Sequence, residues 1–496
     1  MQLAVKLRHL QHVFLLAVTA LAVAIFAKRC FVRVDDAFII FRAVENMRDG
    51  AGLVFNPGEA VMPVTCPLWA LLLVAVGTLF PACPTPDLAL FLSIPILLCG
   101  SLCAYLLLRD RLQYAAALLP LVMFLAPEIT DHVGNEIPLA AMLVMAVLLV
   151  YRRGGSKLWL GALIGLSYLT RGEGVLLAGL LFGHQALLAR REGTLDWRRL
   201  LKSWLPAALG FGIVVLPWML YHQAQFGTLL PQTFGTKMAQ GRSGLWTTFG
   251  NDIWRNLYNS WRGETHLWIS ALFGLPWLLR REPLLVVWVA VHVAAYTLLR
   301  VPHYEWYYYP LYVLTGLCVV AAVDALPRLC LAATRSANVL LRAAALLAVG
   351  AVSYWVMLGY TGHRQASDLI SFLKGPPPGA SSQFTCYQIV ADWLNHNVDP
   401  TDLVASSEIG VIGYYAKRFR FIDPPGIIAR GLTAEQIGRW EPILERYEPA
   451  YIIVRELAVF EPLRVFQLSN KSPTYRKVFE VDATIEYRSA VYRRMP

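Results

Sequence analysis

The stretch HVFLLAVTALAVAIFAKRCFVRVDD, residues 12–36, joins a long apolar run to two adjacent aspartates. Its apolar part, residues 12–28, is long enough to serve as a first membrane helix. Asp35 and Asp36 follow at the mouth of this helix, where carboxylates close to lipid are costly. Side chains kept at such a cost indicate catalysis or ion binding, so the pair is the first candidate for a functional site.

The whole chain has the composition of a polytopic helical membrane protein. Of its 496 residues, 57% are hydrophobic and only 16% are charged, and the mean hydropathy is +0.49. A helix crosses a bilayer core with about 20 apolar residues, and fewer where it is short. Roughly twelve runs qualify: residues 12–28, 66–82, 88–108, 112–126, 137–151, 157–170, 174–189, 203–222, 266–280, 283–300, 306–325 and 337–359.

The net charge of +11 is concentrated in short loops between apolar runs. Basic loops of this kind stay in the cytoplasm under the positive-inside rule. The charge therefore describes topology, and we expect membrane lipids as partners and no nucleic acid. The clearest basic positions are Arg152, Arg153, Lys157, Arg190, Arg191, Arg198, Arg199, Lys202, Arg280, Arg281, Arg328 and Arg335.

The same rule places the alternate segments outside the membrane. These are the loop after the first helix, residues 171–174, 223–264 and 302–305, and everything after Tyr360. An inner N-terminus and an outer C-terminus require an odd number of crossings, so we expect about 11 transmembrane helices. The surplus run is expected between Leu112 and Tyr151. In a bacterium, this topology predicts a multi-pass protein of the inner membrane with its site on the periplasmic side.

The composition changes near residue 360 and divides the chain. We expect a membrane domain at residues 1–360 with outer loops 29–65 and 223–264, a stiff Pro-rich linker at 361–380, and an outer α/β domain at 381–496. The pattern of this last domain predicts a mixed sheet. The expected helices are residues 387–395 and 434–447, and the expected strands are 403–406, 418–422, 451–454, 477–481 and 486–492.

The residues after the acidic pair have the pattern of an amphipathic helix on the membrane surface. Ala37, Ile40, Val44 and Met47 would share one face, and the helix is expected to end at residues 50–52. An aspartate is also among the best N-cap residues. One of the two aspartates could therefore have no role beyond capping this helix. Capping does not explain the second aspartate beside it.

Several short stretches make a resemblance to a known family recognisable. They resemble GT-C glycosyltransferases, especially arabinofuranosyltransferases of the AftB type, over the whole membrane region and more loosely around residues 407–410 and 422–424. The stretches are DDAFIIFR (35–42), GAGLVFNPG (50–58), TCPLW (65–69), GNEIPL (134–139), LTRGEG (169–174), FGTLLPQTFGTK (226–237) and HYEWYYYP (303–310).

This resemblance implies a polytopic GT-C fold and an enzyme that takes a sugar from a polyprenyl-phosphate donor. The sugar it suggests is D-arabinofuranose, and the acceptor is a hydroxyl of a cell-envelope glycan or protein. Two departures concern loops that could line a sugar or acceptor pocket. Met62-Pro-Val-Thr-Cys66 stands where related sequences often have Glu-Gly-Tyr-Thr-Asn, and Gln232 replaces a commoner Asn. The donor sugar and the acceptor therefore remain open.

The expected chemistry needs one base and no general acid. The attacking alcohol must lose its proton, whereas the leaving lipid phosphate is already a weak base. By resemblance to the acidic motif of the class, Asp35 is the predicted base, acting with inversion. Asp36 would orient it, raise its pKa by repulsion, or help hold a divalent cation such as Mg²⁺, Mn²⁺ or Ca²⁺. The sequence shows no ligand set that settles the metal.

The leaving phosphate needs positive charge, which Arg42, Arg171, Lys237 and His303 could supply. Each cation also has a structural alternative: Arg171 could pair with Glu173 or Glu136, Lys237 could reach lipid head groups, and His303 could cap a helix. We favour a functional role for Arg171 and Lys237. The full set of predicted substrate-binding residues is Arg42, Glu136, Arg171, Glu173, Gln232, Lys237, His303, Tyr304, Glu305 and Tyr307.

Other functions are compatible with a polytopic chain. A transporter or flippase of lipid-linked sugar would more often show internal repeats and charges in the middle of helices. A mannosyl or hexosyl transferase of the same architecture, acting on protein or lipopolysaccharide, is a second enzymatic alternative. A third alternative is a non-catalytic anchor whose outer domain binds glycan. No Gly-rich phosphate loop occurs, which disfavours direct use of a nucleotide sugar or ATP.

Overall fold

The computed structural model of this chain describes most of the sequence. The described residues are 2–29, 34–112, 115–126, 129, 132–229, 231–261, 265–333, 382–429, 431–456, 475–484 and 487–495. The last predicted apolar run, residues 337–359, and the predicted linker, 361–380, lie outside them.

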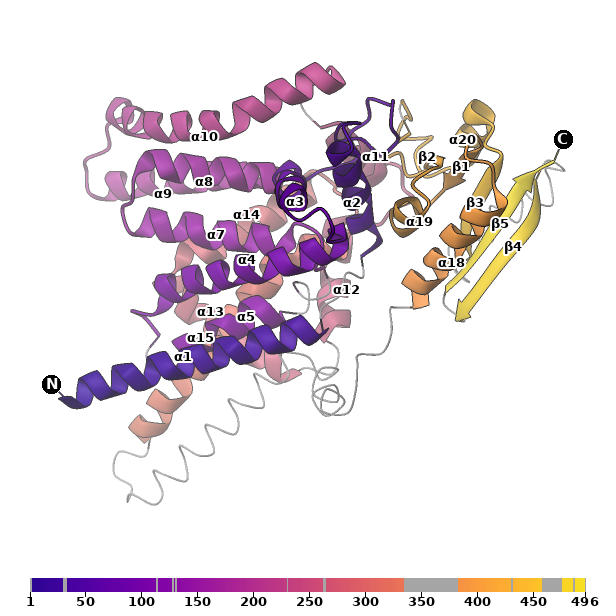
Figure 1. The fold of residues 1–496 in the computed structure, drawn as a ribbon. Coiled ribbons are helices and arrows are strands. Elements are labelled where there is room, and N and C mark those ends of the chain that lie inside the picture. Colours follow the sequence, from indigo (N-terminus) through magenta and orange to yellow (C-terminus); the bar gives the residue numbers. More distant parts are fainter. Residues whose placement is uncertain are drawn as a thin grey trace.

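Apolar helices lie side by side in a bundle (Figure 1). Within the described ranges, four helical segments are long and apolar enough to cross a membrane: Thr85–Leu108, Gly172–Arg191, Trp197–Phe226 and Glu305–Pro327. Shorter apolar helices accompany them. The bundle consists of α1 (Gln2–Arg29), α3 (Pro67–Leu79), α4 (Thr85–Leu108), α5 (Leu119–Leu125), α7 (Ile137–Arg152), α8 (Lys157–Thr170), α9 (Leu176–Arg191), α10 (Trp197–Phe226), α13 (Thr265–Arg281), α14 (Pro283–Leu298) and α15 (Tyr309–Ala333).

Small residues let α8 and α10 approach closely. A Cβ added to Gly161 would lie 1.8 Å from the carbonyl oxygen of Ala207, and one added to Gly210 would lie 2.0 Å from that of Leu158. Membrane helices commonly pack through small residues in this way, because lipid supplies little hydrophobic force to hold them together.

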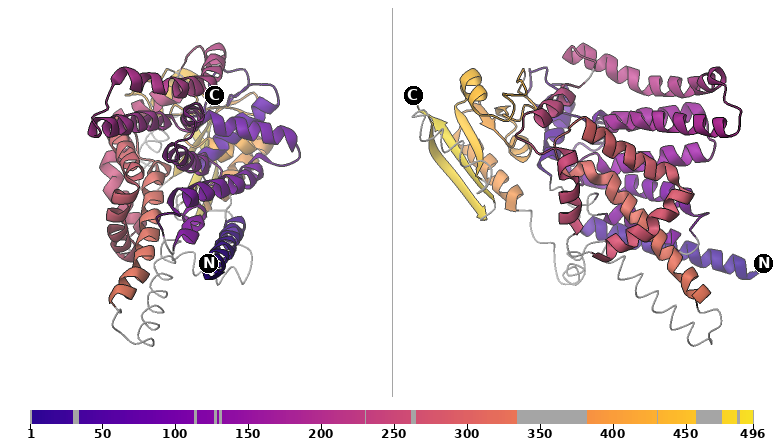
Figure 2. Two further views of the ribbon diagram at one scale, coloured as in Figure 1. Left: turned by 90° about the vertical axis from the view of Figure 1, so that its left-hand side faces the viewer. Right: turned by 180° about the vertical axis from the view of Figure 1, so that it is seen from behind.

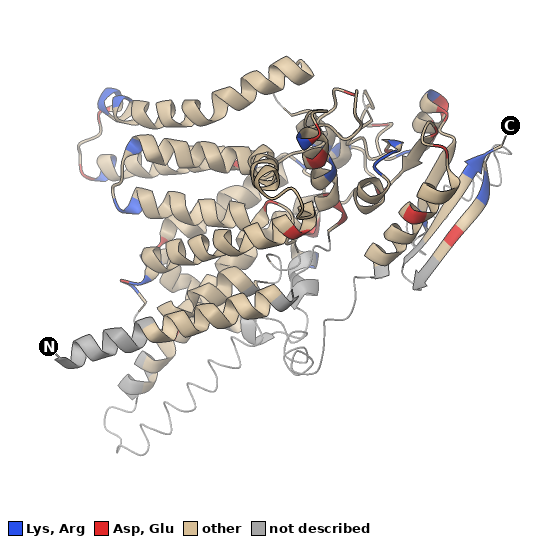
Figure 3. Cartoon of the chain, in the orientation of Figure 1, with Lys and Arg blue, Asp and Glu red and all other residues tan. Residues whose placement is uncertain are grey.

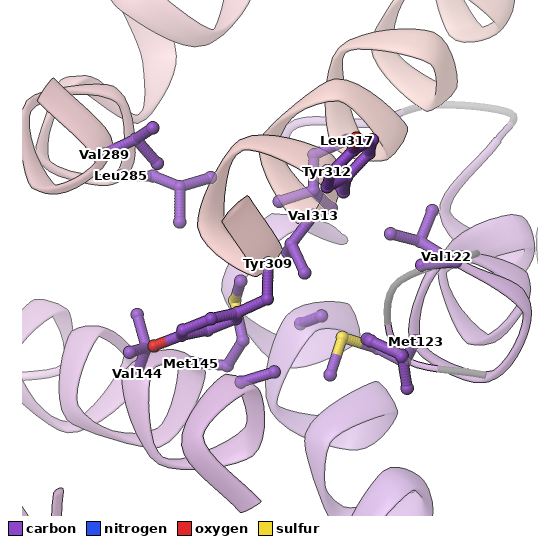
Figure 4. Close-up of a cluster of buried hydrophobic side chains, with 14 of the residues drawn as sticks. Val122, Met123, Val144, Met145, Leu285, Val289, Tyr309, Tyr312, Val313 and Leu317 are labelled. Atoms are coloured by element: carbon purple, nitrogen blue, oxygen red, sulfur yellow. The ribbon is translucent and has the colours of Figure 1, made fainter. Parts of the chain in front are cut away.

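Bulkier side chains fill the bundle where α5, α7, α14 and α15 meet (Figure 4). This part of the core combines aliphatic, methionine and tyrosine side chains, all buried. The labelled members are Val122, Met123, Val144, Met145, Leu285, Val289, Tyr309, Tyr312, Val313 and Leu317. The predicted run at residues 112–126 forms only a 3-10 turn, Ala116–Leu118, followed by α5. With 7 residues, α5 is too short to cross a bilayer.

The charges divide the bundle into two unlike ends. Basic residues gather in the loops that join α7 to α8 and α9 to α10, and the helices between the ends are almost free of charge (Figure 3). The C-terminal domain lies beyond the opposite end (Figure 1), and the view from behind shows the domain at the same end of the bundle (Figure 2). The positive-inside argument requires this separation of the basic loops from the C-terminal domain.

Short helices cover the end of the bundle that faces the C-terminal domain. They are α2 (Asp35–Arg48), α11 (Gln232–Arg242), α12 (Phe249–Trp261) and the 3-10 helices η2 (Gly172–Val175) and η3 (Glu305–Tyr308). The helix after the acidic pair does not have the exposed polar face that its amphipathic pattern predicted, and its position on the membrane surface stays a prediction. Residues on several sides of α2 are buried, including Phe38, Phe41 and Arg42, because the C-terminal domain contacts Arg42 and Glu45 on the side that was expected to meet solvent.

The C-terminal domain has the predicted mixed sheet, with strand order β2-β1-β3-β5-β4. Strand β1 pairs in parallel with β2 and β3, whereas β5 pairs antiparallel with β3 and β4. The elements are α18 (Ser382–Asn397), β1 (Leu403–Ser406), α19 (Gly410–Tyr415), β2 (Arg420–Ile422), α20 (Glu441–Tyr447), β3 (Tyr451–Glu456), β4 (Tyr475–Thr484) and β5 (Tyr487–Arg494).

One predicted helix of this domain is shorter than expected. The sequence pattern extends it over residues 434–447, but α20 begins only at Glu441. Gly438 has a φ of +79°, a left-handed conformation that cannot continue a right-handed helix. Pro442 then occupies the first turn, where its missing N–H costs nothing.

Candidate active site

A cavity of about 470 Å³ lies where the bundle meets α2, α11 and η3. The resembling stretches converge on it: Thr65, Asn135 and Arg171 all belong to its wall, and the Trp69 indole donates a hydrogen bond of 2.9 Å to the Gly134 carbonyl. Apolar side chains from α10 and from the segment before and within α11 form another part of the wall: Trp218, Met219, Leu229, Phe234 and Met238.

The two aspartates have different surroundings. Asp36 lines the cavity. The Asp35 carboxylate instead accepts the backbone N–H groups of Gly410 and Val411, at 2.9 and 2.8 Å. Asp35 therefore caps a helix, although not its own: it binds the first turn of α19 in the C-terminal domain. Helix α2 itself starts after Val34 without a side-chain cap.

Burial makes both carboxylates weaker acids than usual. Burial and the nearby Glu408 raise the pKa of Asp35 to about 8, although the N–H groups of Val411 and Gly410 act in the opposite direction. Burial also raises the pKa of Asp36, while Lys237 and His132 lower it. Asp36 is thus a more basic carboxylate than an exposed aspartate, and it is close to two groups that can carry positive charge.

Lys237 is the cation that the cavity leaves available. It lies on α11, lines the cavity, and its ammonium is 3.8 Å from the centre of the Tyr304 ring. The Nζ atom is buried, and no hydrogen-bond partner for it is found among the described residues. Since a buried ammonium without a partner is costly, its position suits an anionic ligand group.

Arg171 also lines the cavity, but its nitrogens are occupied. Its guanidinium donates to Glu136 at 2.6 Å, to Glu173 at 2.5 Å and to the Tyr296 hydroxyl at 2.8 Å. The ring of Tyr307, another cavity residue, lies 5.0 Å away. The structure has the ion pairs given as the structural alternative for Arg171, with both Glu136 and Glu173. A role of Arg171 in binding the phosphate stays a prediction.

Arg42 lies outside the cavity, which corrects its prediction as a phosphate ligand. Its guanidinium donates to the carbonyl oxygens of Phe55, Gly413 and Phe419, at 2.8, 2.8 and 2.7 Å. The last two belong to the C-terminal domain, near the end of α19. Burial lowers the pKa of Arg42 to about 9. Arg42 and Asp35 therefore bind opposite ends of α19, Arg42 through backbone carbonyl groups and Asp35 through backbone N–H groups.

The other predicted residues lie around the cavity in different roles. The Tyr304 hydroxyl donates to Gln240 at 3.2 Å, so its ring is held beside Lys237. The imidazole of His303 is 2.9 Å from the Tyr308 hydroxyl, and Glu305 is exposed. Gln232 borders a separate shallow groove between α10 and α11. None of these four predicted residues belongs to the wall of the cavity.

Several wall residues were not singled out from the sequence. Asn135 and Thr65 belong to the stretches that resemble the glycosyltransferases, and this resemblance could have identified them as site residues. Ile427 comes from the C-terminal domain, and no sequence signal links it to the membrane domain. Further examples are Thr233 and Thr236 of α11.

The acidic pair does not assemble a cation site with its surroundings. Both Asp35 oxygens are turned toward backbone N–H groups, which leaves Asp36 as the pair's carboxylate in the cavity. Among the residues that the structure describes, no three His, Cys, Asp or Glu side chains are grouped for metal binding. These donors do not fit a protein-held divalent ion, and no chemical step is assigned to one.

Comparison with solved structures identifies the fold. The chain is similar to ArnT from Cupriavidus metallidurans, in the apo state with a TM-score of 0.60 and bound to undecaprenyl phosphate with a TM-score of 0.56. Both matches cover 96% of this chain and 97% of the other, at 15% sequence identity. The chain has the GT-C fold. The predicted polytopic GT-C architecture with a C-terminal α/β domain is thereby confirmed.

Sequence comparison finds two further similarities, each of which covers only part of the chain. The terminal beta-(1->2)-arabinofuranosyltransferase of Mycobacterium tuberculosis is 29% identical over 230 residues, which are 42% of this chain and 35% of that protein. The matched part is thus about a third of the relative's length. Residues 380–492 match a family described as a domain of unknown function, DUF8728. That match covers the C-terminal domain.

Proposed function

We propose that this protein is an inverting membrane glycosyltransferase. It moves a sugar, D-arabinofuranose, from a polyprenyl-phosphate donor to a hydroxyl of a cell-envelope glycan or protein at the outer face of the inner membrane. The observation that carries this proposal is that Asp36 and Lys237 line one cavity, close enough for Lys237 to lower the pKa of Asp36, and that this cavity also has an apolar wall. A lipid-linked sugar phosphate needs all three features.

Asp36 takes the role of the base in this proposal. Its carboxylate accepts the proton of the attacking hydroxyl while the oxygen of that hydroxyl bonds to the anomeric carbon. A raised pKa suits this task, because a base works best when its pKa lies near the operating pH. The role assigned to Asp35 from the sequence passes to Asp36, since the oxygens of Asp35 are engaged by α19.

Lys237 takes the role of the phosphate-binding cation. As the bond between the anomeric carbon and the phosphate oxygen breaks, negative charge develops on the leaving lipid phosphate. A preorganised ammonium in a site shielded from water stabilises that charge strongly. The apolar wall from α10 and α11 suits the first isoprene units of the carrier. ArnT bound to undecaprenyl phosphate and the arabinofuranosyltransferase relative support this donor class.

The test is transfer of radiolabelled arabinofuranose from a polyprenyl-phosphate donor by the purified full-length protein in lipid nanodiscs. Asp36→Asn keeps the shape of the side chain and removes the base, so transfer should fall by at least about 100-fold. Asp110→Asn is the matched control, because Asp110 is exposed and lies next to a basic loop. Normal transfer by Asp36→Asn would exclude this base. Donor that is moved across the bilayer without any transfer would favour a flippase.

A further inference from the structure

The C-terminal domain reaches the cavity through the loop at residues 423–429. This loop follows β2 directly, and its residue Ile427 lines the cavity together with residues of the membrane domain. The family that matches this domain is described without a function. The loop therefore connects a domain of unstated role to the proposed reaction site.

Asp423 holds this loop in one conformation. Its buried carboxylate accepts the backbone N–H groups of Ile427, Ile428 and Ala429, at 2.7, 2.8 and 2.9 Å. Three hydrogen bonds to one carboxylate fix the consecutive peptide units that carry Ile427. The position of the Ile427 side chain thus depends on Asp423.

The same loop also accepts hydrogen bonds from α11, the helix that carries Lys237. The Thr236 hydroxyl donates to the Gly426 carbonyl at 3.2 Å, and the Gln240 amide donates to the Pro425 carbonyl at 2.8 Å. These two donors lie directly before Lys237 and one turn after it, so they set the rotation of α11. Loop and helix form one continuous part of the cavity wall.

The loop lies on the side from which a polar molecule would enter. The C-terminal domain is at the end of the bundle opposite the basic loops (Figures 1 and 3). A glycan cannot approach through the bilayer, because its hydroxyl groups would lose their hydrogen bonds to water. A lipid-linked donor, in contrast, arrives from the membrane.

We infer that the loop 423–429 is the acceptor-side wall of the cavity, that Ile427 is a specificity-determining residue for the acceptor, and that Asp423 is a positioning residue for this wall. The inference rests on the proposed function, since an acceptor-side wall has meaning only if a sugar is transferred. It assigns the C-terminal domain a part in choosing the hydroxyl that is glycosylated.

The test separates acceptor from donor kinetics in the full-length protein, with a short arabinofuranose oligosaccharide as the acceptor probe. Ile427→Trp narrows the wall and should raise the KM for the acceptor by at least about tenfold, an effect of the size that pocket shape usually has. The KM for the donor should stay within about twofold. Ile389→Trp is the matched control, because Ile389 is exposed on α18 of the same domain.

A second pair of variants tests the positioning residue. Asp423→Ala removes the acceptor of all three N–H groups and should raise the KM for the acceptor, whereas Asp423→Asn keeps an acceptor oxygen and should restore part of the loss. If the wild-type protein transfers no sugar, the proposed function itself fails. If transfer is normal and Ile427→Trp changes the donor KM instead, or neither KM, the proposed function stands and this inference is overturned.

Discussion

The Asp35 carboxylate accepts the backbone N–H of Gly410 at 2.9 Å, across 375 positions of sequence. This contact fastens the C-terminal domain to the residue that precedes the proposed base. Any displacement of α19 is therefore transmitted to the first turn of α2, where Asp36 faces the cavity. The two backbone N–H groups that Asp35 accepts thus connect the C-terminal domain to the reaction site.

Gly410 should tolerate no side chain. A Cβ at this position would lie 1.9 Å from the Asp35 carbonyl oxygen, so Gly410→Ala must push α19 away from α2. We expect a loss of about 1–3 kcal/mol in unfolding free energy, measured as a lower Tm, and weaker transfer. Gly179→Ala is the control, because nothing lies within 4 Å of its added Cβ. Equal Tm values for the two variants would contradict the contact.

The stability of the protein should depend on the protonation of Asp35. The folded state raises its pKa from an ordinary 3.8 to about 8, so the folded protein holds this proton more tightly than the unfolded chain. The resulting stabilisation is complete below about pH 4 and is lost as the pH rises through about 8. Tm values measured across this range should fall for the wild type. The decline should be smaller in Asp35→Asn, and equal slopes in both proteins would refute the assignment.

Lys237 should tune the base as well as bind phosphate. Its positive charge lowers the pKa of Asp36, so Lys237→Met should shift the acidic limb of the pH–rate profile to higher pH. The rate at the plateau should also drop, because the leaving phosphate loses its counter-charge. Lys417→Met, at an exposed position of the C-terminal domain, should change neither quantity. If the acidic limb of Lys237→Met did not shift, Lys237 would have no influence on the pKa of Asp36, and the prediction would be contradicted.

Arg42 should be essential for docking and not replaceable by lysine. Its planar group donates to three carbonyl oxygens in different directions, which one ammonium on a flexible stem cannot reproduce. At about 1 kcal/mol for each hydrogen bond, Arg42→Lys should cost about 2–3 kcal/mol. Limited proteolysis should release the C-terminal domain faster from this variant than from Arg48→Lys, which alters the last residue of the same helix.

Local sequence patterns predicted the architecture, and such patterns are reliable in a membrane protein. Hydropathy and basic loops predicted the helical bundle and its two unlike ends, because lipid enforces apolar segments and internal backbone hydrogen bonds. The succession of expected helices and strands after residue 381 predicted the mixed sheet. The helix at residues 434–447 was overextended, since periodicity did not reveal that Gly438 would adopt a positive φ.

Six of the twelve residues that the sequence predicted for the site line the cavity. Asp36, Lys237, Glu136, Arg171, Glu173 and Tyr307 do meet at one cavity. Which aspartate faces it depends on the rotation of α2, and that rotation is set by contacts with α19. Arg42 was mistaken for a ligand because a buried guanidinium that binds carbonyl oxygens looks, in the sequence, like any other cation near a motif.

Composition and periodicity were sufficient for a polytopic bundle, an outer α/β domain and an acidic pair placed between them, because each of these depends on the preferences of neighbouring residues. Only the tertiary structure decided which aspartate of the pair faces the cavity and which one binds the C-terminal domain. Docking of the C-terminal domain engages Asp35 through the N–H groups of α19 and leaves Asp36 to the cavity beside Lys237. Residues hundreds of positions apart make those contacts, and no local pattern encodes them.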